Sequence, residues 1–293
     1  MVRKVNVVES VIHDIGQVPF AGGNFGYGIG CAVDSPQASG GLIRGNTIYN
    51  YQKSGIDLRG ANCSGTSSAP IRIIANQITG KGPTDQIAQN GIVTIGLSFV
   101  AIVGNTIGGH VYTGPLEAAS AGLNILGGPC FSLPFQKNTI LDGNRLVGND
   151  VGIYLLNFTA GCEVAPAIAQ KNIISENDIL NYAVLNTSGN GEGPYQIGIS
   201  ITDNQTDVKN NNICGAGYDS ANEPEGGFVD LIDPAGSVKL KLKSNKCLDN
   251  PAVVKVPGQT SAPASGGAQS TMAAEDSTAK SAASSGKKPQ ARP

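Results

Sequence analysis

A short unit, in which an asparagine is followed by any residue and then by an apolar residue, recurs along most of the chain. Successive copies lie 36, 30, 29, 39, 33, 35 and 33 residues apart, starting from a related copy at Ser10. A period of this length indicates a solenoid, in which each repeat packs on its neighbours. The copies begin at Ser10, Asn46, Asn76, Asn105, Asn144, Asn177, Asn212 and Asn245.

A second unit, glycine followed by isoleucine or leucine, falls between copies of the first, and both lie next to short stretches of alternating polarity. Strands of three to five residues are too short for independent hairpins, so we expect each to pair with the same strand one coil away. We expect the asparagines and glycines at corners that need left-handed or bridging backbone, and the isoleucines and leucines inside. The glycines are Gly28, Gly55, Gly91, Gly122, Gly152 and Gly198.

Two segments, GNTIYNYQKSGIDL and GNRLVGNDVGIYLL, resemble the repeats of right-handed parallel β-helix proteins, the superfamily that includes the pectate lyases. The resemblance covers about residues 2–250. We therefore predict an all-β chain with one right-handed parallel β-helix of about eight coils over residues 1–256. The rival fold is an antiparallel β-sandwich of short strands, which does not require a repeated register.

The chain beyond the repeats has a different composition. Residues 257–293 are mainly Ala, Ser, Gly, Pro and Lys, so they cannot bury enough apolar surface to offset their chain entropy, and we expect a disordered tail. At the other end the strand pattern begins at Val2, without the apolar core of a signal peptide. We expect an upstream segment or a partner to cap the first coil.

The six cysteines are spaced like the coils. Taken in order, they form pairs 32, 32 and 33 residues apart, each in a similar register within the repeat. We predict disulfides between adjacent coils, which place the protein in an oxidising space, secreted or periplasmic. The alternative is a set of small buried apolar residues, above all for the last pair. The predicted pairs are Cys31–Cys63, Cys130–Cys162 and Cys214–Cys247.

Composition and missing motifs exclude several classes of function. A net charge of −2 with only 14% charged residues leaves no basic surface for nucleic acid. No apolar run is long enough to span a membrane. The chain has no Walker or dinucleotide motif, no Cys-x-x-Cys, and only His13 and His110, so we expect neither a cofactor nor a metal. His13 fits a surface turn, in the place that Tyr49 and Thr79 take in the next coils, and His110 fits a loop.

Strand alternation suggests a candidate binding groove on the outside of the β-helix. If the neighbouring isoleucines and leucines point inward, one column of polar and aromatic side chains points outward. An acid, a cation, an amide and an aromatic ring in one column suit a sugar chain. The structural alternative is that the acid and the cation pair with each other, the amide extends a ladder, and the ring covers an apolar patch. The column holds Asp57, Arg59, Asn124 and Tyr154, with Lys53 and Asp150 in the turns that lead to it.

The sequence does not identify a reaction. Glycoside hydrolysis needs two carboxylates roughly 5–10 Å apart, and Asp57 has no acidic neighbour in its column. The arginine, aspartate and histidine motifs of pectate lyases, polygalacturonases and alginate epimerases are missing. We therefore expect an extracellular or periplasmic protein that binds or processes a polysaccharide. The alternatives are a non-catalytic structural β-helix and a fragment of a larger polysaccharide lyase or hydrolase.

Overall fold

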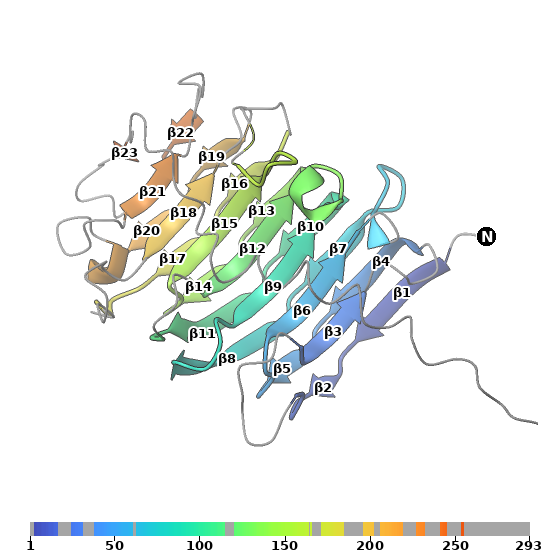
Figure 1. Cartoon of the computed structure of the whole chain (residues 1–293), viewed down its shortest axis with the longest axis horizontal. Helices are drawn as coiled ribbons and strands as arrows, with labels where there is room; N and C mark the ends of the chain where they lie inside the picture. Colours follow the sequence, from blue (N-terminus) through green and yellow to red (C-terminus); the bar gives the residue numbers. More distant parts are fainter. Residues whose placement is uncertain are drawn as a thin grey trace, which may run out of the picture.

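The structure is a computed structural model in which three parallel β-sheets wind around one core (Figure 1). Figure 1 shows the coils stacked in sequence order from β1 to β23. The residues that the structure describes are 3–16, 25–31, 38–60, 63–114, 120–163, 165, 171–184, 196–201, 206–218, 227–231, 241–244 and 253–254.

The chain visits the three sheets in turn, one strand in each per coil. The first sheet contains β1 (Arg3–Val8), β4 (Ala38–Arg44), β7 (Ile71–Ile74), β10 (Ser98–Val103), β13 (Lys137–Asp142), β16 (Ile173–Ser175), β19 (Asp207–Lys209) and β22 (Lys241–Lys243). The second contains β2 (Val11–Ile12), β5 (Thr47–Tyr49), β8 (Gln77–Thr84), β11 (Thr106–Tyr112), β14 (Arg145–Val147), β17 (Asp178–Leu180) and β20 (Asn212–Cys214). The third contains β3 (Tyr27–Cys31), β6 (Ser54–Arg59), β9 (Asn90–Ile95), β12 (Ala121–Gly127), β15 (Val151–Asn157), β18 (Ile197–Ile201), β21 (Gly227–Leu231) and β23 (Val253–Val254).

This architecture confirms the predicted all-β parallel solenoid and excludes the antiparallel sandwich for the described strands. The second sheet has seven strands, so the described residues complete seven coils rather than eight, and β22 and β23 extend the other two sheets. Among the described residues, the short 3₁₀ helices η2 (Pro129–Phe131) and η3 (Ala216–Tyr218) lie in connections between strands. The predicted tail at 257–293 and the predicted domain boundary at 256 lie outside the described residues.

Columns of buried aliphatic side chains from all three sheets fill the interior. Each of these buried side chains contributes roughly 1.5–3 kcal/mol of transfer free energy. The second-sheet column shows the pattern most clearly: Ile48, Ile78, Ile107, Leu146, Ile179 and Ile213 stack in register. The predicted inward residues of the third sheet are likewise buried: Ile56, Leu58, Leu123, Ile125, Ile153, Leu155, Ile199 and Ile201.

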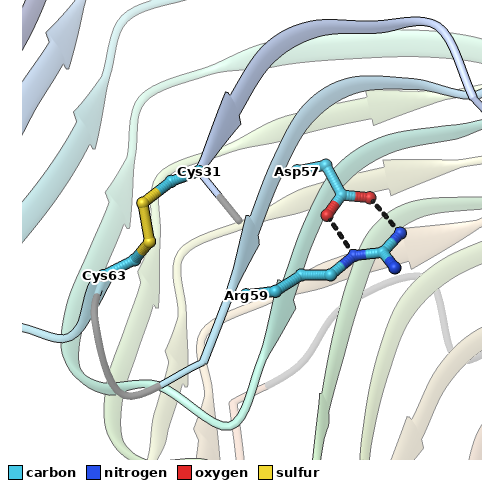
Figure 2. The surroundings of a disulfide bond; sticks show 4 residues. All are labelled: Cys31, Asp57, Arg59 and Cys63. Atoms are coloured by element: carbon cyan, nitrogen blue, oxygen red, sulfur yellow. Dashed lines mark hydrogen bonds and ion pairs between the residues drawn. A yellow bond between two sulfur atoms is a disulfide. The ribbon is translucent and has the colours of Figure 1, made fainter. Parts of the chain in front are cut away.

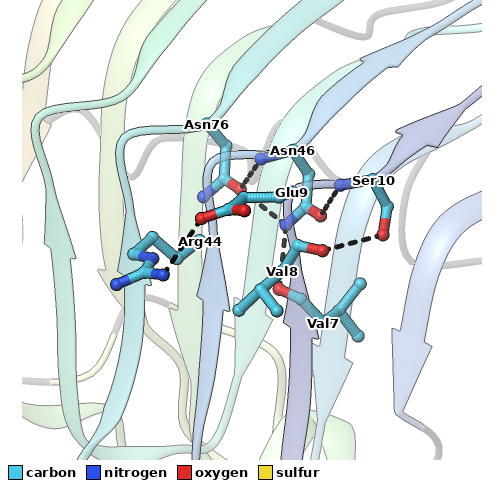
Figure 3. Close-up of polar contacts among 7 residues, drawn as sticks. All are labelled: Val7, Val8, Glu9, Ser10, Arg44, Asn46 and Asn76. Carbon is cyan, nitrogen blue, oxygen red and sulfur yellow. Dashed lines mark hydrogen bonds and ion pairs between the residues drawn. The ribbon is translucent and has the colours of Figure 1, made fainter.

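A buried ladder of asparagine side chains runs along the corner between the first and second sheets (Figure 3). The Asn46 side-chain Nδ2 donates to Oδ1 of Asn76 at 2.8 Å and to the carbonyl oxygen of Val7 at 3.0 Å. The Asn46 backbone N–H also donates to Asn76 Oδ1, and the next coils repeat the arrangement. Ser10 has no side-chain amide, but its backbone N–H donates to Asn46 Oδ1 in the same way. The ladder comprises Asn46, Asn76, Asn105, Asn144, Asn177 and Asn211.

The ladder corrects the predicted register of one repeat. Asn211, rather than Asn212, accepts the hydrogen bonds from Asn177, and Asn212 pairs with Asp178 within the sheet. Asn211 and Asn212 are adjacent, and each is followed two residues later by an apolar residue, so the sequence pattern alone could begin at either one. The predicted copy at Asn245 lies outside the described residues.

The expected left-handed backbone belongs to the residue before each ladder position, and not to the asparagine itself. These preceding residues all have φ between 50° and 65° although their side chains differ. The ladder therefore supplies the hydrogen bonds of a corner whose unusual backbone lies one residue earlier. The preceding residues are Glu9, Gly45, Ala75, Gly104, Gly143, Glu176 and Asn210.

The repeated glycines of the third sheet are explained by space rather than by left-handed backbone. Gly28 and Gly55 are not among the residues with positive φ. A Cβ atom on Gly28 would lie 2.7 Å from Cγ2 of Ile48, and one on Gly55 would lie 2.5 Å from Cγ2 of Ile78. A glycine is therefore required at these positions because the isoleucine side chains of the second sheet leave no space for a Cβ atom. The prediction that these glycines adopt left-handed backbone is wrong.

Two of the predicted disulfides are confirmed, and each joins adjacent coils. Cys31 ends β3 and bonds Cys63, which follows β6, with 6.3 Å between the Cα atoms (Figure 2). The pair Cys130–Cys162 joins the connections after β12 and β15, with a Cα separation of 4.8 Å. Cys214 is also disulfide-bonded. Its predicted partner, Cys247, lies outside the described residues, so that pairing stays a prediction.

Candidate functional site

The outer face of the third sheet carries Asp57, Asn124 and Tyr154 in one column as predicted, whereas Arg59 lies in the next outward column, in register with Ile95. Asn124 lies beside Tyr154 in the sheet, and Tyr154 lies beside Ser200. Asp57 is separated from Asn124 by Val93, a residue that the sequence analysis missed because β9 carries apolar side chains on both faces. The side chains of Asn124 and Tyr154 are half-buried, so this column is partly accessible.

Asp57 and Arg59 form a closed ion pair at the start of the column (Figure 2). Arg59 donates from Nε and from one terminal nitrogen to the two carboxylate oxygens of Asp57, at 2.6 and 2.9 Å. Asp57 is only 3% exposed, whereas the Arg59 side chain is 23% exposed. The arrangement confirms the structural alternative for this pair, because Asp57 is occupied in orienting the guanidinium.

Tyr27 completes this polar cluster, and the sequence analysis did not include it. Its hydroxyl accepts a hydrogen bond from Arg59 at 3.1 Å, and the guanidinium lies 5.3 Å from the centre of its ring. Burial alone would lower the pKa of Arg59, but the hydrogen bond and charge of Asp57 raise it above its usual value. Arg59 is therefore a fixed cation whose side chain is 23% exposed.

Lys53 lies at the entrance to β6, near the ion pair but not bonded to it. Its ammonium donates to the carbonyl oxygen of Ala88 in the next coil at 2.8 Å. Burial lowers the pKa of Lys53 to about 8; Asp57 opposes this shift, and Arg59 adds to it. Lys53 thus lies in the turn that leads to β6, as predicted, and is half-buried; its role in ligand binding stays a prediction.

Polar atoms in the column lack hydrogen-bond partners. Oδ1 of Asn124 and Oγ of Ser200 are buried, and neither has a partner in the structure. They belong to the two residues on either side of Tyr154. A buried polar atom without a partner costs about 1–3 kcal/mol.

An apolar cluster lies beside the polar column on the same face. Ile95, Leu126 and Leu156 follow Arg59 across the sheet in register and are buried, with Tyr154 packed against them. The predicted covering of an apolar patch by Tyr154 is thus confirmed. The cluster was not predicted, because alternation assigns outward positions to polar residues by default.

Asp150 does not join the predicted site. It is buried, and its Oδ2 accepts hydrogen bonds from the backbone N–H groups of Tyr112 at 2.7 Å and Ser120 at 3.3 Å. Its carboxylate holds the connection between β11 and β12 against the next coil. The sequence placed it correctly in the turn before β15 but could not show which way it points.

The two histidines differ in their surroundings. His110 lies in β11 rather than in the predicted loop and is fully buried, with hydrogen bonds to Tyr51 Oη and, at 2.7 Å, to Asn149 Oδ1. Burial lowers the pKa of His110 to about 4. His13 is exposed, which confirms its predicted place on the surface, and it stacks on Tyr49. In the described part of the chain, no group of three or more His, Cys, Asp or Glu residues gathers as metal ligands.

Comparison with models of known families, with curated proteins and with solved structures gives no significant match for this chain. Among the described residues there is also no helix with the length and apolar character needed to cross a membrane.

Proposed function

We propose that the protein binds a polysaccharide in an extracellular or periplasmic space, along the outer face of the third sheet. The resemblance of its repeats to the pectate-lyase superfamily favours a glycan ligand. The two disulfides are compatible with an oxidising space. The observation that carries the proposal is the unpartnered Oδ1 of Asn124, which lies beside half-buried Tyr154 in one column, with half-buried Arg59 in the next outward column of the same face.

Each accessible residue of the column has a role suited to a sugar chain. The edge of the guanidinium of Arg59 donates to hydroxyl or carboxylate oxygens, while Asp57 keeps it in place. Asn124 Oδ1 accepts from a hydroxyl, and Tyr154 offers an aromatic surface. Binding is favoured over catalysis because Arg59 already occupies both oxygens of Asp57, and Asp150 is committed to backbone amides.

The test is the affinity of the full chain for a panel of neutral and acidic polysaccharides. Asn124→Leu removes the acceptor but keeps the side-chain volume, so we expect about tenfold weaker binding without loss of stability. Arg72→Ala, on the exposed outer face of the first sheet, is the matched control and should bind like wild type.

Two results would contradict the proposal. Equal affinity of wild type and Asn124→Leu would remove the column from the binding site. No binding by the folded wild type to any polymer would favour the structural scaffold, for which the uninterrupted asparagine ladder is the supporting observation.

A further inference from the structure

The strands β1, β2 and β3 form the first coil, at one end of the stack (Figure 1). Among the described strands, β1 pairs only with β4, β2 only with β5, and β3 only with β6. The other edge of each strand therefore carries backbone N–H and C=O groups that no described strand pairs. An edge of this kind is a template for a further strand.

The hydrophobic core is also partly open at this end. Three apolar residues of the first coil pack against the core but stay half-buried: Val7, Ile12 and Ile15. Their neighbours in register in the second coil, which has a coil on each side, are at most 3% exposed: Ile43, Ile48 and Tyr51. Covering the first coil would therefore remove further apolar surface from water, which is favourable.

The sequence of β1 is complementary to a second copy of itself when the two strands run antiparallel. The strand begins with two cationic residues, Arg3 and Lys4, and the anionic Glu9 follows its last residue. Antiparallel pairing therefore places the cationic start of each copy opposite the anionic end of the other. The Glu9 side chain forms an ion pair with Arg44 (Figure 3) but is still 74% exposed, so it has room for a second cation.

The two faces of β1 select one register for such a pair. Val7 lies on the core side of the strand and Asn6 on the outer side. A twofold axis perpendicular to the first sheet keeps core side with core side, so it must pass through a residue rather than between two. With the axis at Asn6, Arg3 is opposite Glu9 of the second copy, and Val5 is opposite Val7.

We propose that two copies of this chain associate end to end through their first coils, with their β1 strands paired antiparallel about a twofold axis at Asn6. The first sheets of the two copies then form one continuous sheet, and the axis brings the free edge of β2 against that of β3 in the other copy. The half-buried apolar residues of the two first coils cover each other. The outer face of the third sheet stays open, so the inference does not depend on the proposed function.

Sedimentation velocity of the full chain over a series of concentrations tests for this dimer. An interface limited to one coil is small, so we expect wild type to pass from dimer to monomer on dilution. Lys4→Glu places an anionic residue beside Glu9 of the other copy, twice in the symmetric contact, and should raise the dissociation constant about tenfold. Lys209→Glu makes the same change at an exposed residue of β19, far along the first sheet, and should associate like wild type.

Cysteine cross-linking tests the position of the axis. Asn6→Cys brings two thiols together at the axis, where the Cα atoms of directly opposite residues are about 4.5–5.5 Å apart, within the range of a disulfide. Air oxidation should then give a covalent dimer on a non-reducing gel. Lys4→Cys is the matched control on the same strand, because the two copies of this position lie four residues apart along the pair, roughly 13 Å, and should not link.

The results either support this dimer or overturn it. Concentration-dependent association that Lys4→Glu weakens, with cross-linking of Asn6→Cys alone, supports it. A wild type that stays monomeric at every concentration would overturn it in favour of a cap of different sequence. A dimer that Lys4→Glu leaves unchanged, or one in which Lys4→Cys links as readily as Asn6→Cys, would also overturn it, because the contact would then lie elsewhere. The polysaccharide panel and Asn124→Leu test the proposed function separately.

Discussion

Replacement of Asn105 in the middle of the ladder tests how much the asparagine column stabilises the fold. The Nδ2 group of Asn105 donates to Asn144 Oδ1 at 3.0 Å and to the carbonyl oxygen of Ile73 at 2.9 Å. Its Oδ1 accepts from the backbone N–H and from Nδ2 of Asn76, both at 2.9 Å. A fifth hydrogen bond runs from Nδ2 to the carbonyl oxygen of Val103 at 3.3 Å, so the change Asn105→Ala removes five hydrogen bonds at a site that is closed to water.

The expected cost follows from the groups left behind. The backbone N–H of Asn76 loses its acceptor completely, and its Nδ2 keeps only the bond to the carbonyl oxygen of Ile43. A buried group left unsatisfied costs about 1–3 kcal/mol. Two donors are affected, so we expect Asn105→Ala to lower the free energy of unfolding by about 3 kcal/mol. Gln77→Ala, on the exposed face, should change it by less than about 0.5 kcal/mol.

Urea denaturation measures this loss, and hydrogen exchange of individual amides locates it. The Asn76 amide should lose protection in Asn105→Ala, whereas the Asn177 amide, two ladder positions away, should change little. A second variant, Asn105→Asp, keeps the acceptor but removes the donor, so it should be most destabilised at neutral pH and recover as the carboxyl is protonated. A loss below 1 kcal/mol for Asn105→Ala, with unchanged urea dependence, would refute this account of the ladder.

Three further predictions concern packing, cross-links and pH. Gly91→Ala places a Cβ against Cγ2 of Ile107 and should cost about 1–3 kcal/mol in urea unfolding, whereas Gly30→Ala, whose nearest neighbour is 3.8 Å away, should cost far less. Replacing Cys130 with alanine should lower stability by about 3–4 kcal/mol, given the 32-residue separation, and reductant should then affect the variant less than wild type. The pKa of His110 is about 4 when folded against 6.5 when unfolded, so its contribution is complete above pH 6.5 and is lost as the pH falls through 4. His110→Gln should therefore flatten the decline in melting temperature over that range.

The fold could be predicted because the same residue types recur at the same positions of successive coils: an asparagine at the corner and an aliphatic residue two positions later. Register follows from the aliphatic residue that ends each unit, which correctly aligned Tyr49 with Thr79 and placed His13 beside them. The backbone conformation of the corner could not be predicted. Ala75 and Glu176 adopt it as readily as Gly45, because the ladder that follows determines it, so no residue type marks the position.

The candidate site was predictable in its order but not in its accessibility. Alternation aligned Asn124 with Tyr154 correctly. It could not show that Arg59 closes on Asp57, because that depends on side-chain conformation rather than on strand direction. It also could not reveal Tyr27, which reaches Arg59 from the preceding coil through the third sheet.

The two disulfides described above also determine how the molecule would respond to tension along its axis. The boundaries between coils carry such a load in series, so the weakest boundary yields first. The bond Cys31–Cys63 crosses the boundary between the first and second coils, and Cys130–Cys162 crosses that between the fourth and fifth. These two joints cannot open without breaking a covalent bond. Rupture is therefore confined to the boundaries held by hydrogen bonds and packing alone, and the cross-linked coils separate from their neighbours as intact pairs.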